Sequence, residues 1–204
     1  MSEPADGKPL RGVSRRMFLK TVGVGAAATG LAGAATGAAQ AAPPAILGPG
    51  RVPLNLKING TVQHVRVEPR VTLLRALRNH LGLTGAKEVC ERGGCGGCTV
   101  LLDGEPICSC MMLAVDAEGH EITTVEGLGT PERMSPVQAA FVEADALQCG
   151  FCTPGFVVAS TALLAKHPNP TLDEIKAGLA GNLCRCGTYS RIFDAVQLAA
   201  KRKG

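Results

Sequence analysis

The chain has 204 residues, of which 46% are hydrophobic and 19% are charged. This composition excludes an intrinsically disordered chain, and the length suits one ordinary domain or two small ones. Residues 1–41 hold five basic and two acidic side chains, a net charge of +3, whereas the remaining 163 residues hold 16 basic and 15 acidic ones, or +1. We therefore expect no basic surface for nucleic acid. The nine cysteines, none of which precedes Cys90, are the anomaly of the composition.

The N-terminal segment predicts an export signal. Residues 14–20 are S-R-R-M-F-L-K, and a Gly/Ala-rich apolar stretch follows from Val22 to about Ala39. The stretch is too short and too weakly hydrophobic for a stable membrane anchor, and it ends in a small-x-small cleavage pattern at residues 39–41. Residues 14–20 resemble the twin-arginine export signal, which implies that the protein is exported already folded, to the periplasm. The alternative is an amphipathic helix whose two arginines occur by chance.

We therefore divide the chain into a signal peptide at 1–41, a Pro- and Gly-containing linker at 42–52, and the exported body. Beyond the signal, no apolar run is long enough to cross a bilayer, so the mature chain is expected to have no membrane span.

The first part of the body predicts a small α+β domain at 53–128. Alternating apolar residues flank the turn dipeptide Asn59-Gly60, which indicates a hairpin. Leucines at helical spacing predict a helix from Thr72, its N-cap, to Leu81, with Gly82 ending it. A glycine-rich cysteine loop then leads into an apolar strand at 99–102, a turn at 103–104 and a further strand beginning at Ile107.

The second part, residues 134–204, predicts an all-α domain. Ser135-Pro136 is an N-cap followed by proline at the first helical position. A second helix is expected from Pro154 to about Lys166, ending before a proline. Residues 171–174 form a capping box that opens a third helix, and a fourth fits residues 190–201.

The first cysteine group has the spacing of a plant-type [2Fe–2S] site. Cys90, Cys95 and Cys98 follow the x4 and x2 pattern, and the fourth ligand is either Cys108 or Cys110. The intervening glycines let the backbone approach a cluster closely and direct its N–H groups at the sulfur atoms. A structural zinc site would bring two close pairs instead. A disulfide framework would be natural after export, but nine is an odd number.

The second cysteine group comprises Cys149, Cys152, Cys184 and Cys186, with spacings C-x2-C and C-x-C. Spacing alone leaves iron–sulfur and zinc ligation open, because zinc uses similar pairs. The surrounding residues are Q-C-G-F-C-T-P-G at 148–155 and G-N-L-C-R-C-G at 181–187. The two motifs, in this order, resemble the iron–sulfur subunit or domain of the xanthine dehydrogenase/aldehyde oxidoreductase family of molybdenum hydroxylases. The resemblance covers about residues 53–200.

The resemblance implies two [2Fe–2S] clusters. It assigns the first to a β-grasp ferredoxin-like domain, with the ligands Cys90, Cys95, Cys98 and Cys110. Cys110 takes the family position, after a serine and before an apolar helix start at Met111. The second lies in an all-α four-helix domain, with the ligands Cys149, Cys152, Cys184 and Cys186. In the family this second cluster is nearest the molybdenum cofactor of a large subunit. The residue that corresponds to Gln148 contacts the pterin of that cofactor. The residue that corresponds to Cys186 lies near the same pterin.

Two features depart from the family pattern or leave it open. Cys108 has no assignable counterpart, and is either a buried spare thiol or an alternate ligand. The run at 187–192 is G-T-Y-S-R-I, which is more similar to exported aldehyde oxidoreductase and N-heterocycle subunits than to many xanthine dehydrogenases. The substrate class therefore stays open.

The sequence contains no dinucleotide fingerprint, P-loop or nucleophile elbow. We therefore interpret the chain as the electron-transfer subunit, not the catalytic subunit, of a periplasmic molybdenum hydroxylase of aldehyde oxidoreductase type. The expected partners are a molybdenum-cofactor large subunit and, as electron acceptor, a flavin subunit or a cytochrome. The alternatives are the iron–sulfur subunit of an isoquinoline- or nicotinate-type dehydrogenase, a freestanding exported ferredoxin, and a structural zinc protein.

Overall fold

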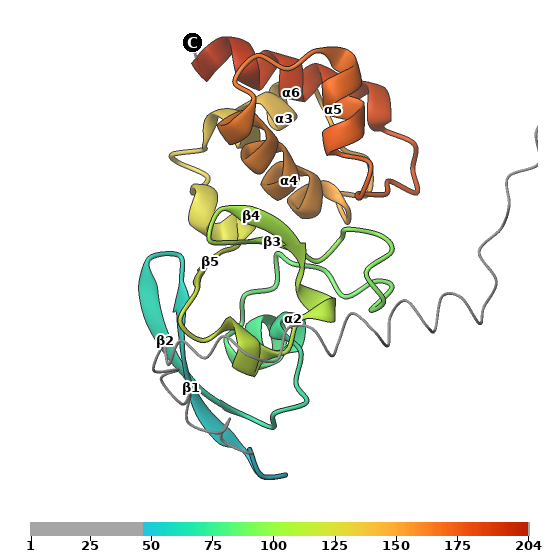
Figure 1. Cartoon of the computed structure of the whole chain (residues 1–204). Helices are drawn as coiled ribbons and strands as arrows, with labels where there is room; N and C mark the ends of the chain where they lie inside the picture. The colour runs from blue at the N-terminus through green and yellow to red at the C-terminus, as the bar shows by residue number, and fades with distance from the viewer. Residues whose placement is uncertain (1–46, 204) are drawn as a thin grey trace, which may run out of the picture. The chain divides into compact units, whose positions relative to one another are not determined.

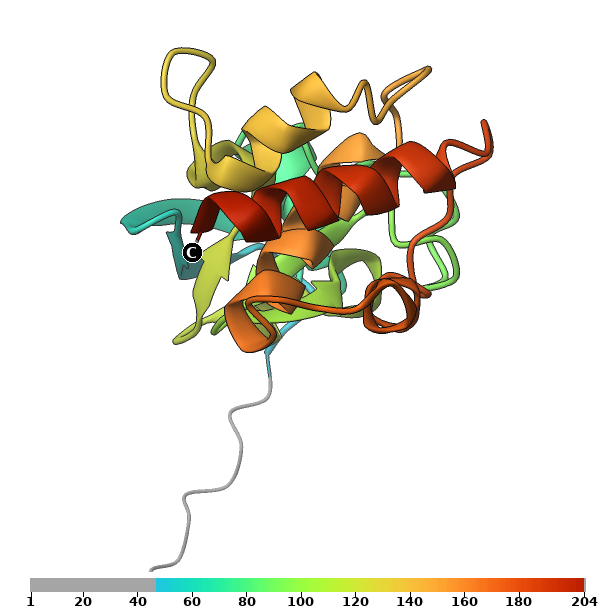
Figure 2. The same cartoon turned by 90° about the horizontal axis from the view of Figure 1, so that it is seen from above.

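The computed structural model describes residues 47–203, which form a mixed β-sheet and a set of helices (Figures 1 and 2). The predicted signal peptide and the first part of the predicted linker lie outside these residues. The described part is α+β, as predicted, with strands concentrated before residue 124 and the longer helices after residue 135. Within residues 47–203 no helix is both long enough and apolar enough to span a membrane.

A hairpin opens the sheet. Strands β1 (Val52–Ile58) and β2 (Thr61–Val67) pair antiparallel around the Asn59-Gly60 turn. Both turn residues have positive φ, 52° and 78°, the conformation that favours Asn-Gly in a two-residue hairpin. The predicted hairpin is confirmed, and its alternating apolar residues face the core.

The five strands lie in the order β2-β1-β5-β3-β4, with β5 (Glu121–Thr123) parallel to β1. Strand β3 (Thr99–Leu102) pairs antiparallel with both β5 and β4 (Glu105–Cys108). Strand β4 begins two residues earlier than expected, at Glu105, and contains Pro106. A proline is tolerated there because β4 is the edge strand of the sheet, where a missing N–H breaks no ladder.

The helical segment after β2 has the predicted bounds, with Thr72 as its N-cap and Leu81 as its C-cap, but it is less regular than predicted. It consists of one α-helical turn, α2 (Leu73–Arg75), and a π-helical turn, Ala76–His80, that follows directly. Thr72 caps it as predicted, accepting a hydrogen bond from the Arg75 N–H at 3.3 Å. The wider turn is closed by the bond from Leu81 N–H to the Ala76 carbonyl, five residues back.

The C-terminal part contains the helices α3 (Pro136–Glu143), α4 (Thr153–Lys166), α5 (Leu172–Gly178) and α6 (Tyr189–Lys203). Ser135 and Thr171 form the capping boxes of α3 and α5, so both predicted helix starts are confirmed. In Figure 1 these helices gather at one end of the described part, and the sheet and α2 lie at the other. Figure 2 shows α6 lying across its neighbours.

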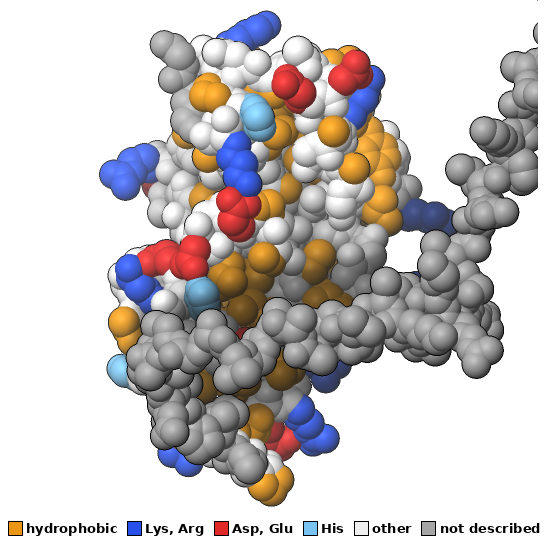
Figure 3. All heavy atoms as spheres, viewed as in Figure 1, with side chains coloured by type: hydrophobic (Ala, Val, Ile, Leu, Met, Phe, Trp, Pro, Cys, Tyr) orange, Lys and Arg blue, Asp and Glu red, His pale blue; other side chains and the backbone are white. Residues whose placement is uncertain are grey.

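Each end has its own hydrophobic core. One core lies between the sheet and α2 and includes Leu56, Leu73 and Ile122, and the other lies among the helices and includes Phe141 and Phe156. Helix α4 joins them, because its buried side chains pack on β3 in a small third cluster: Leu101, Val158 and Ala162. The exposed ion pair between Lys166 of α4 and Glu105 of β4 spans the same junction and contributes little stability. On the face shown in Figure 3, basic and acidic side chains lie interspersed.

Candidate functional site

The first thiol group lies where the loop 90–98 enters β3 and where β4 ends. Cys98 and Cys110 are buried, with 3% and 6% of their surface exposed, and Cys90, Cys95 and Cys108 are partly buried. The loop turns inward through left-handed backbone positions, among them Gly93 with φ 70° and Gly96 with φ 67°. Glycine is favoured at these two positions because it alone adopts such φ values without strain.

Backbone N–H groups point at the sulfur atoms of this loop. The pKa of Cys90 is lowered to about 7, first by the backbone N–H of Arg92 and then by the Cys95 side chain. The Gly97 N–H donates to the Cys95 sulfur at 3.5 Å. Such donors stabilise a thiolate, which is the form that binds iron.

Gly93 distinguishes the two candidates for the fourth ligand. Burial raises the pKa of Cys110, but the Gly93 backbone N–H also bonds to its sulfur and favours the thiolate. Burial likewise raises the pKa of Cys108, whose Sγ lies 3.8 Å from the Gly93 carbonyl oxygen. A carbonyl accepts from a thiol and repels a thiolate, so this geometry favours Cys110 as the ligand and Cys108 as a protonated thiol. The apolar helix start expected at Met111 is instead a 3₁₀ turn, Ser109–Met111.

The second thiol group lies on the loops at one end of α4 and α6. Cys184 is buried, Cys152 is half-buried at the N-cap position of α4, and Cys149 and Cys186 are exposed. The flanking turns again use left-handed glycines, Gly150 and Gly187.

Cys152 and Cys184 lie within hydrogen-bonding reach of each other, with unlike environments. Burial raises the pKa of Cys152 to about 12, and the Cys184 side chain adds to the effect. Burial also acts to raise the pKa of Cys184, but hydrogen bonds led by the Thr188 N–H, 3.4 Å from its sulfur, outweigh it and lower that pKa to about 7. The buried Thr188 side chain also lies close to the Cys184 sulfur and favours its thiolate.

The two thiol groups therefore fit [2Fe–2S] clusters. Among residues 47–203, no three His, Cys, Asp or Glu side chains converge on a single metal-ion position. A [2Fe–2S] cluster does not require three protein ligands at one metal ion, because its four cysteines divide between two iron atoms. The N–H···S bonds and the left-handed glycines are features that favour such a cluster.

A tight polar junction joins the two groups. The Leu183 N–H donates to the Cys95 carbonyl at 2.9 Å, and Leu183 is the residue before Cys184. The buried Asn182 amide donates to the Gly96 carbonyl at 3.0 Å and lies 3.3 Å from Thr99 Oγ1. The sequence analysis gave Asn182 no role, although it lies inside the 181–187 motif, since nothing in its spacing shows which loop it meets.

An apolar exposed surface surrounds the second group. Val89, Phe151 and Leu183 are each about half exposed and line a hollow that also contains Cys149 and Cys152. The Lys87 ammonium lies 5.9 Å from the Phe151 ring centre, a cation–π contact at the rim. Gln148 is exposed beside Cys149, so its predicted contact with a partner is sterically open.

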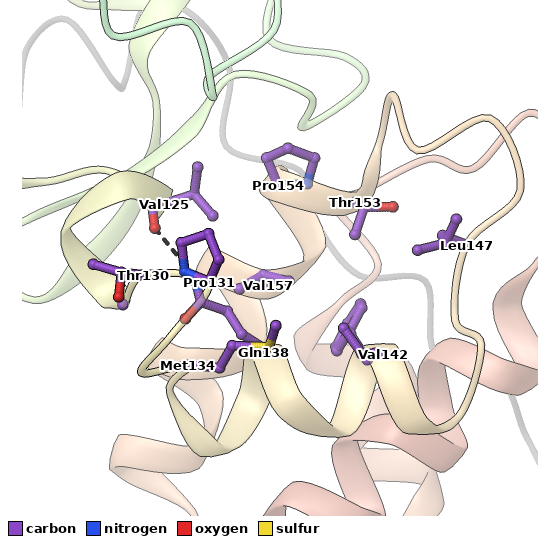
Figure 4. Close-up of a pocket in the computed structure, with 12 residues that line it drawn as sticks. Val125, Thr130, Pro131, Met134, Gln138, Val142, Leu147, Thr153, Pro154 and Val157 are labelled. Carbon is purple, nitrogen blue, oxygen red and sulfur yellow. Dashed lines mark hydrogen bonds between the residues drawn. The ribbon is translucent and has the colours of Figure 1, made fainter.

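Next to Gln148 opens an apolar groove of about 310 Å³ between α3, the start of α4 and the segment 125–134 (Figure 4). Leu147, two residues before Cys149, lies at one end of the groove, and Met134 and Val142 are among the exposed apolar side chains of its walls. The Gln138 amide, at 3.4 Å from the Val125 carbonyl, closes one side.

Comparisons with known proteins agree with this chemistry. A family model described as "2Fe-2S iron-sulfur cluster binding domain" matches residues 56–124, and one described as "[2Fe-2S] binding domain" matches residues 124–197. The chain is 40% identical over 203 residues to the aldehyde oxidoreductase iron–sulfur-binding subunit PaoA of Escherichia coli, covering 92% of this chain and 88% of that one. It is 44% identical to the nicotinate dehydrogenase small FeS subunit of Eubacterium barkeri, covering 74% and 97%.

Solved structures give the same result. A chain of quinoline 2-oxidoreductase from Pseudomonas putida matches with a TM-score of 0.72 and 46% identity, over 76% of this chain and 98% of that chain. The aldehyde oxidoreductase of Desulfovibrio desulfuricans matches with a TM-score of 0.72 and 38% identity, over 74% of this chain and 17% of that much longer one.

The fold and the matches define a protein with two [2Fe–2S]-binding regions in one chain. The chain belongs to the xanthine dehydrogenase/aldehyde oxidoreductase family, as its iron–sulfur subunit. It is accordingly the small electron-transfer subunit of a multi-subunit oxidoreductase and not the catalytic subunit.

Proposed function

We propose that this chain carries electrons from the molybdenum cofactor of a large subunit to an external acceptor, in a periplasmic molybdenum hydroxylase of aldehyde oxidoreductase type. Its two [2Fe–2S] clusters supply one-electron redox centres. The first is held by Cys90, Cys95, Cys98 and Cys110 in a β-grasp domain at 53–128, and the second by Cys149, Cys152, Cys184 and Cys186 in a four-helix domain at 134–204.

The observation that carries this proposal is the junction between the two thiol groups. The hydrogen bond from Leu183 N–H to the Cys95 carbonyl links a ligand of the first cluster to the residue beside a ligand of the second. Asn182 and Gly96 hold the same two loops together from a buried position. These hydrogen bonds would hold the two clusters at a fixed separation. Electron transfer between clusters requires a fixed separation, whereas two independent metal sites do not require one.

The surface near the second group supports docking to a partner. Cys149 and Cys186 are exposed, and the apolar side chains of Val89, Phe151 and Leu183 surround the hollow beside Cys149. Exposed apolar patches of this kind typically become buried in an interface. We assign this face to contact with the large subunit. The Gln148 amide can both donate and accept hydrogen bonds, which suits the edge of a pterin that carries both donors and acceptors.

The aldehyde oxidoreductase type is favoured by the extent of one match. The PaoA alignment covers 92% of this chain, so it reaches into residues 1–41, which precede the 163-residue body. The nicotinate dehydrogenase match covers 74%. The second candidate is therefore an N-heterocycle dehydrogenase subunit, which the quinoline 2-oxidoreductase match supports at 46% identity.

The test is metal analysis and EPR of the chain purified within its native complex. Eight ligand cysteines imply about four iron and four sulfide per chain and two distinct signals after reduction. A single signal, or zinc in place of iron, would contradict the two-cluster assignment. Reduction of the clusters by an aldehyde but not by quinoline or nicotinate would support the aldehyde type, and the opposite preference would favour the second candidate.

Recovery of the chain without any molybdenum-containing subunit would instead favour the freestanding ferredoxin. The number of clusters and the presence of a molybdenum-containing subunit are measured on the same preparation, because metal content and co-purifying subunits are determined together.

A further inference from the structure

Exposed apolar side chains are concentrated around two hollows near the second thiol group. Among residues 47–203, eleven large apolar side chains are exposed, and six of them line these hollows. Three surround the hollow beside Cys149, and the other three line the groove between α3 and the start of α4: Val89, Phe151 and Leu183 in the hollow, and Met134, Val142 and Leu147 in the groove. Exposed apolar residues are normal when they occur singly, whereas a cluster marks an interaction site.

One segment, residues 147–154, borders both the hollow and the groove. Its two ends, Leu147 and Pro154, line the groove, while Cys149 and Phe151 between them line the hollow. Gln148, the proposed pterin contact, lies between Leu147 and Cys149. The groove is therefore continuous, along this segment, with the face that we assign to the large subunit.

The lining of the groove favours an uncharged occupant. None of its twelve lining residues is charged. The amide of Gln138, one of the few polar side chains, is already engaged, because it donates to the Val125 carbonyl and accepts from the Ser135 N–H. A charged group inserted here would lose its hydration without gaining a partner, so the groove suits apolar side chains.

Helix α3 leaves the groove open to a partner. Phe141 of this helix is buried, with 2% of its surface exposed, whereas the next residue, Val142, is 60% exposed. In Figure 4, Val142 and Leu147 point into the space between α3 and the start of α4. An inserted segment would bury both side chains and remove apolar surface from water.

We propose that this groove receives an apolar segment of the molybdenum-cofactor large subunit and anchors that subunit beside the second cluster. The inference rests on the proposed function, and it adds a contact that involves neither a cysteine nor Gln148. The partner segment carries aliphatic or aromatic side chains at its centre and no charged one. An anchor this close to Gln148 would restrict how the second cluster is oriented toward the large subunit.

The first experiment measures the affinity of the cluster-loaded chain for the large subunit by titration. Val142→Asp should weaken this affinity about tenfold or more, because docking would bury its carboxylate without a partner. The matched control is Val62→Asp, since Val62 is 57% exposed and lies on the edge strand β2. Its affinity should stay within about twofold of wild type. The two EPR signals report folding in both variants.

The second experiment identifies the occupant of the groove in the assembled complex. The photoreactive amino acid p-benzoylphenylalanine replaces Val142, and mass spectrometry locates the cross-link after irradiation. The cross-link should lie in an apolar segment of the large subunit, and the same replacement of Val62 should give none there. Cross-linking to a second copy of this chain, to residues 1–46 or to the acceptor would overturn the proposal, as would no cross-link.

The titration separates failure of this inference from failure of the proposed function. A wild-type chain that binds no molybdenum-containing subunit would refute the proposed function. A wild-type complex that Val142→Asp forms with the same affinity as Val62→Asp would refute the groove assignment alone. Should Val142→Asp lose the second EPR signal, Val142→Ser and Val62→Ser replace the pair, with an expected loss of about fivefold in the first and none in the second.

Discussion

Gly155→Ala is expected to force apart the two loops that carry the clusters. Gly155 lies in the first turn of α4, and a Cβ atom there would be 2.3 Å from the Gly96 carbonyl oxygen and 3.1 Å from Asn182 Nδ2. Ordinary contact begins near 3.4 Å, so the backbone of the cysteine loop must retreat by about 1 Å. The same retreat weakens the bond between Leu183 N–H and the Cys95 carbonyl.

The magnitude follows from two opposing terms. Overpacking of a rigid interior costs about 1–3 kcal/mol, and alanine recovers about 0.5–1 kcal/mol over glycine inside a helix. The net expectation is a loss of about 1–2 kcal/mol in the free energy of unfolding, or about 2–8 °C in Tm for a unit of this size. Electron transfer between the clusters should slow as their loops separate.

The matched control is Gly178→Ala, the last residue of α5. A Cβ atom there meets side-chain atoms of Leu163, the nearest at 2.8 Å, and these belong to the flexible end of one leucine. Its stability should therefore stay within about 1 kcal/mol of wild type. Urea unfolding of both holo variants, followed by visible absorbance and circular dichroism, measures the difference. A Gly155→Ala protein as stable as Gly178→Ala would refute the reasoning.

Three further predictions concern docking, export and pH. Gln148→Ala should retain both EPR signals but weaken the affinity for the large subunit about fivefold, because one lost hydrogen bond costs ~1 kcal/mol. Titration of the variant with the large subunit measures this affinity, and an unchanged value would contradict the prediction. Replacing Arg15 and Arg16 by lysine should leave cofactor-loaded precursor in the cytoplasm, measured by fractionation; normal export would show that the segment is not this signal. Hydrogen bonds from the Thr171 backbone and side chain lower the pKa of Glu174 from its ordinary value. The stability that the Glu174 carboxylate adds is therefore present above the ordinary pKa of a glutamate and is lost as the pH falls through the lowered pKa. Thermal unfolding of wild type and Glu174→Ala should accordingly converge in acid and differ at neutral pH.

Local patterns predicted the elements whose causes are local. The Asn59-Gly60 turn, the Thr72 cap and the capping boxes at Ser135 and Thr171 depend on neighbouring residues, and the structure contains each of them. The cysteine spacings and motifs likewise carried the family assignment, because ligation restricts residue identity at fixed intervals.

The remaining features depend on distant parts of the chain. The π-helical turn at Ala76–His80 and the early start of β4 at Glu105 follow from packing and from strand order. The role of Asn182 could not be predicted, since its partners Gly96 and Thr99 lie more than eighty residues away. The eight proposed ligands remain a prediction, which metal analysis and EPR of the native complex test.

The junction at Asn182 has a consequence for how the protein acquires its cofactors. Each loop donates or accepts hydrogen bonds at the other, so a cluster that orders one loop also reduces the conformational entropy that the other loop must still lose. Insertion of the first cluster should therefore raise the affinity of the chain for the second, and by reciprocity the second for the first. Half-loaded molecules would therefore be scarce at equilibrium, and the chain would be found with both clusters or with neither.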